Sequence, residues 1–181
     1  MTVVPDPGAC DWRLCPLVPD DLALYVALYT DVAVMRHIAP PRSPRAAAAD
    51  FRAALALPAG PLSEGRQRRV LRLGEGRGIG LLAVDPVGDV LELGLMLLPQ
   101  EQGRGLGRRI VARVLRELAL RAAGKAVQVQ YQPGNRAMAA LAQTFAPDAP
   151  RAGPGSERLT QRLCADAVPH SILRRSRCPC S

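Results

Sequence analysis

Apolar residues recur along the chain with two different periods, and these periods separate helical segments from strands. A short apolar run over residues 12–17 predicts a first strand. Residues 19–35 carry apolar side chains at helical spacing and predict one helix. Residues 43–57 predict a second helix, because Ser43 can cap its first amides and Pro44 suits its first turn. The chain therefore begins with a strand and two helices.

From Arg68 the period becomes that of strands. Three short β-prone runs follow, at residues 68–73, 78–84 and 90–98, and turn-forming residues separate them. Strands joined by such short turns are usually antiparallel neighbours. The runs therefore predict a three-stranded meander directly after the two helices.

The segment from residue 106 to Gly124 returns to helical spacing, with one apolar face and one rich in arginine. The apolar face consists of Leu106, Ile110, Val111, Val114, Leu115 and Leu118. A fifth strand at 126–131, a fourth helix at 135–145 and a last strand at 156–165 follow. This order, β-α-α-β-β-β-α-β-α-β, predicts an α/β fold with mixed strand directions.

The charge of the chain limits its partners. The net charge is +8 and comes almost wholly from arginine, because Lys125 is the only lysine. Such a surplus favours phosphate-bearing or acidic partners. Aromatic residues make up only 3% of the chain, too few for the stacking platforms of single-strand binders. No helix-turn-helix or zinc-finger spacing is present. A nucleic-acid partner is therefore disfavoured.

The cysteines and the absence of long apolar runs indicate the compartment. The number of cysteines is odd and none forms a C-x-x-C unit, so neither a disulfide framework nor a metal site is predicted. These cysteines are Cys10, Cys15, Cys164, Cys178 and Cys180. The first residues lack the pattern of a signal peptide, and no apolar run approaches the ~20 residues of a membrane span. We therefore predict a cytoplasmic protein without a membrane partner.

The stretch from Pro99 to Ile110 places three glycines at alternate positions between a predicted strand and the arginine-rich helix. A glycine-rich turn at the start of a helix leaves N–H groups unpaired at the positive end of the helix dipole. Because glycine has no Cβ, a ligand can approach these amides closely. The pattern therefore predicts a site for a phosphate or pyrophosphate group.

Two familiar phosphate-binding motifs do not fit this stretch. A Walker loop needs lysine followed by serine or threonine, whereas Arg108 and Arg109 follow Gly107. A Rossmann fingerprint needs a third glycine three positions after a Gly-x-Gly pair, and Arg108 and Ile110 hold those positions. Residues 74–80 also fail this spacing and predict a hairpin. ATP hydrolysis and dinucleotide binding are therefore disfavoured.

The segment Gln102–Gly107, QGRGLG, matches a third motif, Q/R-x-x-G-x-G/A. On this motif the chain resembles the GCN5-related N-acetyltransferases, the GNAT family. Residues 91–107 resemble the strand, loop and helix start of bacterial members. Residues 34–38 and 135–138 resemble segments of the branch that acetylates ribosomal proteins. The predicted order of elements is also that of the family, so the resemblance covers about residues 12–164.

The resemblance implies a fold as well as a motif. It implies a single acetyltransferase-like domain over residues 1–181, in which 165–181 form an arginine-rich tail. Its mixed central sheet would have about seven strands, with helices on both faces and a splay between strands 4 and 5. We expect a ligand to insert at that splay almost as an additional strand.

The resemblance also implies acetyl-coenzyme A as the acetyl donor. The glycine-loop amides would wrap its pyrophosphate, an arginine would lie near the other phosphate, and the preceding strand would bind the pantetheine through its backbone. The implied cofactor-binding residues are Leu95, Met96, Leu97, Gln102, Gly103, Arg104, Gly105, Leu106, Gly107, Arg108 and Asn135. Asn135 is also suited to be the N-cap of the fourth helix, and both roles are compatible.

Acetyl transfer to an amine needs a proton acceptor, because amines with pKa values of about 8–10 arrive charged. Glu92 is the candidate base, since several relatives place a carboxylate on this strand, although it could instead face solvent or pair with an arginine. Tyr131 is the candidate acid, although a tyrosine at the end of a strand could instead belong to the core or its rim. Relatives that acetylate ribosomal proteins carry a tyrosine where this chain has Ala142, and a glutamate where it has Gln130. The usual acid and base are therefore missing.

Arg36 and His37 lie in the segment expected to form the acceptor wall. The resemblance implies a small-molecule amine or a protein N-terminus as acceptor, and few acidic residues in these segments argue against a polyamine. A sensor or decayed paralogue that binds acetyl-coenzyme A without turnover is the main alternative. A basic nucleic-acid accessory protein ranks below it, and a homodimer is left open.

Overall fold

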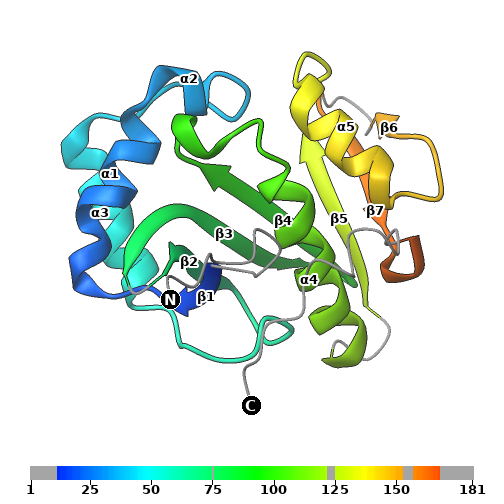
Figure 1. The fold of residues 1–181 in the computed structure, drawn as a ribbon, viewed down its shortest axis with the longest axis horizontal. Helices are drawn as coiled ribbons and strands as arrows, with labels where there is room; N and C mark the ends of the chain where they lie inside the picture. The colour runs from blue at the N-terminus through cyan, green and yellow to red at the C-terminus, as the bar shows by residue number, and fades with distance from the viewer. Residues whose placement is uncertain (1–11, 75, 122–124, 153–156, 168–181) are drawn as a thin grey trace, which may run out of the picture.

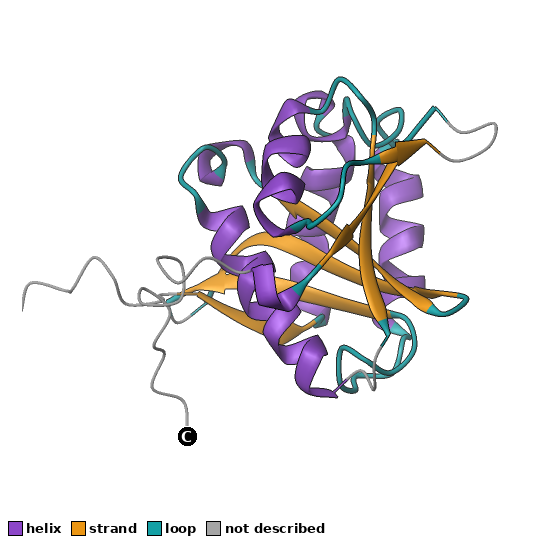
Figure 2. Ribbon diagram, turned by 90° about the vertical axis from the view of Figure 1, so that its right-hand side faces the viewer, coloured by secondary structure: helices purple, strands orange, loops and turns teal. Residues whose placement is uncertain are grey.

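A computed structural model of the chain describes residues 12–74, 76–121, 125–152 and 157–167. These residues form a mixed seven-stranded sheet with helices on both faces (Figure 1 and Figure 2). The strands are β1 (Trp12–Pro16), β2 (Gln67–Leu73), β3 (Arg77–Val87), β4 (Val90–Leu97), β5 (Ala126–Tyr131), β6 (Arg151–Ala152) and β7 (Leu159–Leu163). The α-helices are α1 (Leu22–Thr30), α2 (Val32–Met35), α3 (Pro44–Leu55), α4 (Leu106–Arg121) and α5 (Arg136–Phe145). The predicted α/β class is confirmed.

The sheet divides where its parallel pair of strands separates. Its order is β1-β2-β3-β4-β5-β7-β6, and β4 with β5 is its parallel pair among the described residues. That pairing joins Val90–Glu92 to Ala126–Gln128 and then stops, although β4 continues to Leu97. On its other side β4 stays paired with β3 up to Leu97. Figure 1 shows the two strands close at one end and apart at the other. The expected splay between strands 4 and 5 is confirmed.

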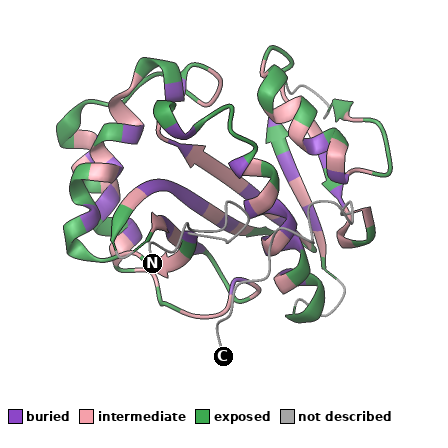
Figure 3. Cartoon of the chain, in the orientation of Figure 1, coloured by how far each residue is buried: buried purple, intermediate pink, exposed green. Residues whose placement is uncertain are grey.

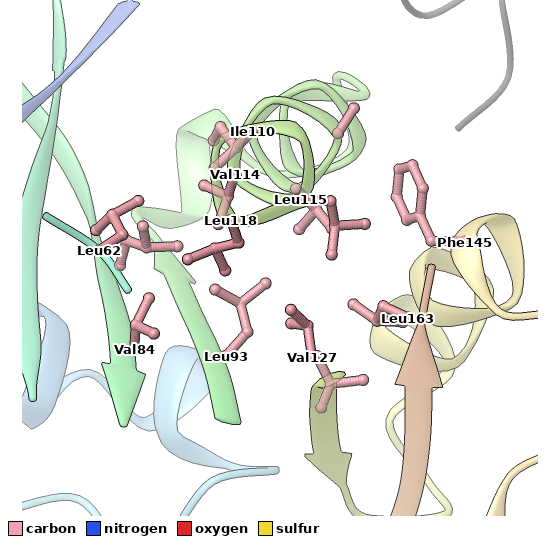
Figure 4. Close-up of a cluster of buried hydrophobic side chains, with 14 of the residues drawn as sticks. Leu62, Val84, Leu93, Ile110, Val114, Leu115, Leu118, Val127, Phe145 and Leu163 are labelled. Carbon is pink, nitrogen blue, oxygen red and sulfur yellow. The ribbon is translucent and has the colours of Figure 1, made fainter. Parts of the chain in front are cut away.

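Two hydrophobic cores cover the two faces of the sheet. On one face α4 and α5 pack onto the strands, and their apolar side chains converge (Figure 4). Leu115 and Leu118 are almost fully buried there, and burying such a side chain stabilises the fold by about 1.5–3 kcal/mol. On the other face α1 and α3 pack through Tyr25, Leu28 and Phe51. Buried positions accordingly follow the central strands and the inner helix surfaces (Figure 3). The six apolar residues expected on one face of α4 are all buried.

The predicted helix over residues 19–35 is wrong in one respect, because Asp31 interrupts it. Asp31 has an extended ψ of 120°, and its Oδ1 accepts a hydrogen bond from Val34 N at 2.9 Å. Aspartate offers the backbone such a cap in competition with the helical hydrogen bonds. The segment therefore forms α1 and α2 instead of one helix. The residues after α2 then contact the turn after β5 and the residue before β7.

The other predicted elements agree with the structure, with small changes in their limits. Ser43 Oγ accepts a hydrogen bond from Ala46 N at 3.2 Å and caps α3 as expected. The meander β2-β3-β4 is antiparallel, but β3 extends through the predicted turn at 85–87, and the turn lies at Gly88 and Asp89. The short strand β6 was not predicted. Gly124, the expected end of α4, lies outside the described residues.

The described cysteines, Cys15 and Cys164, are free thiols. Cys10, Cys178 and Cys180 lie outside the described residues, as does most of the arginine-rich tail. None of the helices in the described ranges is long and apolar enough to cross a membrane.

Candidate functional site

The glycine loop connects the end of β4 to the start of α4. A 3-10 turn (Pro99–Glu101) follows β4, and Gly103 and Gly105 then both adopt a φ of 72°. Only glycine adopts this left-handed conformation without strain. A Cβ built at either glycine would have no neighbour within 4 Å, so the space beside the loop is open. The loop thus presents bare backbone to its surroundings.

A run of amides in this loop points away from the protein. Within the described part of the chain, the amides from Gly103 to Arg108 make no hydrogen bond, and the first helical bond runs from Arg109 N to Gly105 O at 3.4 Å. The helix behind them has 16 residues, so its dipole places a partial positive charge at this end. Arg104 and Arg108 are exposed beside the amides. This arrangement can bind a phosphate or pyrophosphate group.

Several contacts hold the loop in place. Gln102 Nε2 donates to Leu97 O at 2.8 Å, and Leu98 N donates to Ile79 O at 2.9 Å. A Cβ on Gly107 would lie 3.0 Å from Leu141 Cδ1, so the absence of a side chain lets α4 approach α5. Gln102, predicted to bind the cofactor, therefore uses its side-chain amide to hold the end of β4.

The loop also contains a buried acid that the sequence analysis missed. Glu101 is 3% exposed, and it accepts hydrogen bonds from Arg77 and from Arg104. The motif itself contains no signal for this contact, because Arg77 lies 24 residues earlier in the chain. Arg104, predicted to bind phosphate, is thus tethered to Glu101.

The free edge of β4 runs from the loop toward the point where β4 and β5 join. Beyond Glu92 the strand has no partner on the β5 side, so alternate backbone N–H and C=O groups of Leu93–Leu97 face the opening. The side chain of Leu95 packs toward α4, and that of Met96 packs toward α1 and α3. The Leu97 carbonyl is already used by Gln102. The edge and the loop together suit a long ligand with an anionic end and an amide-bearing arm.

Glu92 lies where the two strands begin to separate. Its neighbours in the ladders are Asp85 on β3 and Gln128 on β5. Arg68 binds both carboxylate oxygens of Asp85, at 2.9 and 3.0 Å, and Arg66 Nε lies 2.9 Å from Oδ1. Glu92 is half-buried and, among the described residues, makes no hydrogen bond or ion pair. Its carboxylate is therefore available to accept a proton.

Tyr131 lies in the hydrophobic core instead of the splay. It is 2% exposed, and its hydroxyl donates to Gln161 Oε1 on β7 at 2.8 Å. Gln161 Nε2 donates in turn to Asp148 O at 3.0 Å. Burial raises the pKa of Tyr131, which makes its hydroxyl a poorer acid. This placement argues against the predicted role of Tyr131 as proton donor.

We therefore expect Tyr131→Phe to lower stability by about 1 kcal/mol and to change kcat less than about threefold. The lost hydrogen bond leaves Gln161 with one buried acceptor unpaired. Urea denaturation measures the first effect and steady-state kinetics the second. A fall in kcat of about a hundredfold in a folded variant would restore the acid role.

Asn135 is the N-cap of α5, as the sequence allowed. Its Oδ1 accepts a hydrogen bond from Met138 N at 3.0 Å. Ala142, which occupies the place of the relatives' tyrosine, lies on the inner face of α5 and is fully buried in the core. Gln130, in the place of their glutamate, is exposed on β5. Neither position supplies an acid or a base.

The predicted acceptor wall reaches across the splay. Arg36 ends α2 and is exposed, and His37 is half-buried. A Cβ on Gly134, in the turn after β5, would lie 3.8 Å from His37 Cε1. The carbonyl of Ile38 accepts a hydrogen bond from Arg158, just before β7. The segment after α2 therefore contacts the turn after β5 and the residue before β7, and these contacts connect the two sides of the opening between β4 and β5.

The sequence and the fold were compared with those of known proteins. A family model described as the acetyltransferase (GNAT) domain matches residues 12–145, well over half of the chain. Comparison with curated proteins gave no match.

Solved structures include similar folds. An acetyltransferase from Agrobacterium tumefaciens str. C58 shares 26% identity and a TM-score of 0.64, with 83% of this chain and 89% of that chain covered. A spermidine N-acetyltransferase from Vibrio cholerae, in complex with coenzyme A and spermine, shares 16% identity and a TM-score of 0.65, with coverages of 84% and 94%. The ribosomal L7/L12 alpha-N-protein acetyltransferase RimL, in complex with coenzyme A, shares 15% identity and a TM-score of 0.68, with coverages of 89% and 98%. At 16% and 15% identity, the similarity to the last two proteins is evidence for the fold alone.

Proposed function

The chain belongs to the GNAT acetyltransferase family, and from this premise we propose that it transfers an acetyl group to a primary amine while both reactants are bound. The observation that carries the proposal is the open edge of β4 beside a loop of unpaired amides. One binding surface thereby joins a phosphate site to a strand edge. The carboxylate of Glu92 lies at the closed end of that edge.

Acetyl-coenzyme A is the acetyl donor of this family, and its shape fits the residues described above. Its phosphates suit the amides from Gly103 to Arg108, supported by Arg104 and Arg108. Its pantetheine arm carries amides that suit the unpaired backbone of Leu93–Leu97. Asn135, at the start of α5, adds a polar group across the opening. When bound, the donor supplies an activated acetyl group as a thioester.

The residues of this chain then have three tasks in the proposed reaction. Glu92 accepts the proton that the amine must lose before its nitrogen attacks. A backbone N–H of the Leu95–Leu97 segment polarises the acetyl carbonyl. The loop holds the donor so that the two reactants meet in one orientation. In total a C–N bond forms and the C–S bond breaks, and the second proton of the attacking nitrogen passes through water to the departing thiolate, because Ala142 carries no acid and the hydroxyl of Tyr131 is held in the core.

The missing acid does not prevent turnover. Acid–base help is worth about 10²- to 10⁴-fold, whereas orienting two reactants in one site can be worth more than 10⁵-fold. Loss of one proton donor therefore slows the reaction without removing the larger contribution. We expect a modest kcat that depends strongly on donor binding.

Two linked measurements test this function. Acetyl-coenzyme A is expected to raise the melting temperature of the protein, because a ligand that binds the native state stabilises it. Incubation with a panel of primary amines is expected to release free thiol, which a thiol reagent detects. A thermal shift without thiol release from any amine would favour a sensor over an enzyme. No shift at all would overturn the donor site.

The acceptor side of the splay carries more positive than negative charge. On the face of β5 and β7 opposite α5, strand alternation places Gln128, Gln130, Thr160 and Arg162. Arg36 and Arg158 lie nearby on the wall. On the described residues of the adjoining strands β3 and β4, Asp85 and Glu92 share this face, and Asp85 is neutralised by its arginines, which leaves Glu92. We therefore propose a neutral or anionic amine-bearing acceptor, such as an amino acid or a peptide N-terminus.

We expect kcat/KM for a peptide N-terminus or an amino acid to exceed that for spermidine at least about tenfold, because like charges repel at close range. A kinetic comparison at constant amine concentration measures this ratio. Added salt should narrow the gap, since it screens the repulsion. Preference for spermidine at low salt would contradict the proposed acceptor class.

A further inference from the structure

Glu101 is a buried carboxylate beside the glycine loop, and the proposed reaction leaves it without a role. It lies in the 3-10 turn after β4 and is 3% exposed. Its Oε1 accepts a hydrogen bond from Arg77 Nη2 at 2.7 Å, and its Oε2 accepts one from Arg104 Nη1 at 3.4 Å. Arg77 is the first residue of β3, and Arg104 lies between the two left-handed glycines. One carboxylate therefore connects the sheet to the loop.

The two ion pairs of Glu101 differ in strength. A buried carboxylate stays charged only with a close cationic partner, and Arg77 supplies it at 2.7 Å. The Arg104 contact is longer, at 3.4 Å, and the Arg104 side chain is 70% exposed, so this pair contributes little stability. Arg104 can therefore leave Glu101 for the phosphate of a ligand while Arg77 still neutralises the acid.

Glu101 also lies in the segment that directs the chain into the loop. Leu98 is bonded to Ile79 of β3, and Gln102 is bonded to Leu97 of β4. The ion pair between Arg77 and Glu101 is a third link between this segment and the sheet, and it is the link that involves charged groups. Among the described residues, the backbone amides from Gly103 to Arg108 make no hydrogen bond, and α4 packs against Leu141 through Gly107. The links at Leu98, Glu101 and Gln102 therefore fix the point from which the free amides of the glycine loop begin.

We propose that Glu101 is a positioning residue for the phosphates of the donor. Through Arg77 it fixes the start of the glycine loop against β3, and through Arg104 it keeps a cation at the rim of the free amides. This inference rests on the proposed use of the loop as a phosphate site. It adds two residues, Glu101 and Arg77, that lie outside the QGRGLG motif.

The sign of one substitution separates positioning from simple charge. Glu101→Gln removes a negative charge beside a site for a polyanion, and Coulomb attraction alone would then strengthen binding. The positioning role predicts the opposite, because Arg77 loses its charged partner and the loop loses its anchor. Weaker binding of an anion after removal of a nearby anion is therefore the signature of this role.

The experiment compares two ligands by isothermal titration calorimetry, coenzyme A and pantetheine, of which the second lacks phosphate. For E101Q we expect about tenfold weaker binding of coenzyme A, since hydrogen bonds to charged groups are of this strength, and pantetheine binding within about twofold of wild type. Arg77→Met, which cuts the same link from its exposed side, should repeat this result. The double variant should then add little, because both changes break one connection.

Asp21→Asn is the matched control. Asp21 is also 3% exposed, and it accepts a hydrogen bond from Arg72 Nη2 at 2.6 Å; Arg72 donates as well to Gly76 O at 3.1 Å, and neither residue of this pair has a hydrogen bond to Glu101 or to the glycine loop among the described residues. Its substitution makes the same change of charge in a buried carboxylate–arginine pair. We expect a lower melting temperature, with the ratio of coenzyme A to pantetheine affinity unchanged.

Other outcomes would overturn the inference in distinguishable ways. If E101Q and R77M bind coenzyme A as tightly as wild type or more tightly, Glu101 does not position the loop. Equal weakening of both ligands would show a general structural effect. If wild type itself binds coenzyme A no more tightly than pantetheine, the loop is not a phosphate site, and the proposed donor site fails together with this inference.

Discussion

Replacing Gly105 by valine is expected to lower the affinity for acetyl-coenzyme A roughly a hundredfold while the protein stays folded. Gly105 precedes α4 with a φ of 72°, a conformation that a β-branched residue adopts only with strain. The loop must then take another path, and the amides from Gly103 to Arg108 would no longer converge on one phosphate. Calorimetric titration measures the loss of affinity, and circular dichroism checks the fold.

Gly88→Val is the control for backbone strain. Gly88 also has a positive φ, 57°, and a Cβ there would likewise meet nothing within 4 Å. It lies in the turn between β3 and β4, at the opposite end of β4 from the glycine loop. We expect this variant to lose stability but to bind acetyl-coenzyme A normally. Equal loss of affinity in both variants would indicate general destabilisation, and normal binding by G105V would exclude the loop as the phosphate site.

Features encoded by nearby residues were predictable from the sequence. The cap at Ser43, the meander and the glycine loop each depend on contacts within a few positions, which local patterns report well. The amphipathic face of α4 was equally clear, because its apolar residues repeat at helical spacing over 16 residues. The splay came from the family resemblance, since no local pattern states where two parallel strands separate.

Features that depend on distant partners were not predictable. Tyr131 was a candidate proton donor that could instead be a core residue, and the contact that places its hydroxyl in the core is with Gln161, 30 residues later. Glu101 lies one residue before the QGRGLG motif, and its partner Arg77 is 24 residues earlier in the chain, at the start of β3. In each case the side chain competes for a hydrogen bond whose partner is set by the tertiary fold.

In the proposed reaction the donor and the acceptor contact different parts of the molecule. The proposed donor residues lie mainly on β4 and α4, on both sides of one loop, with Asn135 at the start of α5, and the loop geometry is local to the backbone. The acceptor wall combines the segment after α2 with the turn after β5, which meet at His37 and Gly134. A change in either of these segments can therefore alter the acceptor without disturbing the loop. Glu92 lies at the closed end of the opening, where β4 and β5 are still paired.

Replacing Glu92 by glutamine is expected to lower kcat about a hundredfold and to leave the affinity for acetyl-coenzyme A within about twofold, because a positioned base contributes 10²- to 10⁴-fold. The amide cannot accept the amine proton, whereas the backbone edge of β4 is unchanged. Activity of the variant should recover as the pH approaches the pKa of the amine, about 8 for a chain terminus, since the amine then arrives uncharged. Glu117→Gln, on α4, makes the same chemical change away from the splay and should retain wild-type kcat. Unchanged kcat in E92Q would remove Glu92 from the reaction, and loss of acetyl-coenzyme A binding would assign it to the donor site. Slow turnover that recovers with pH, with donor affinity unchanged and Glu117→Gln at wild-type kcat, would support the carboxylate at the junction of β4 and β5 as the proton acceptor.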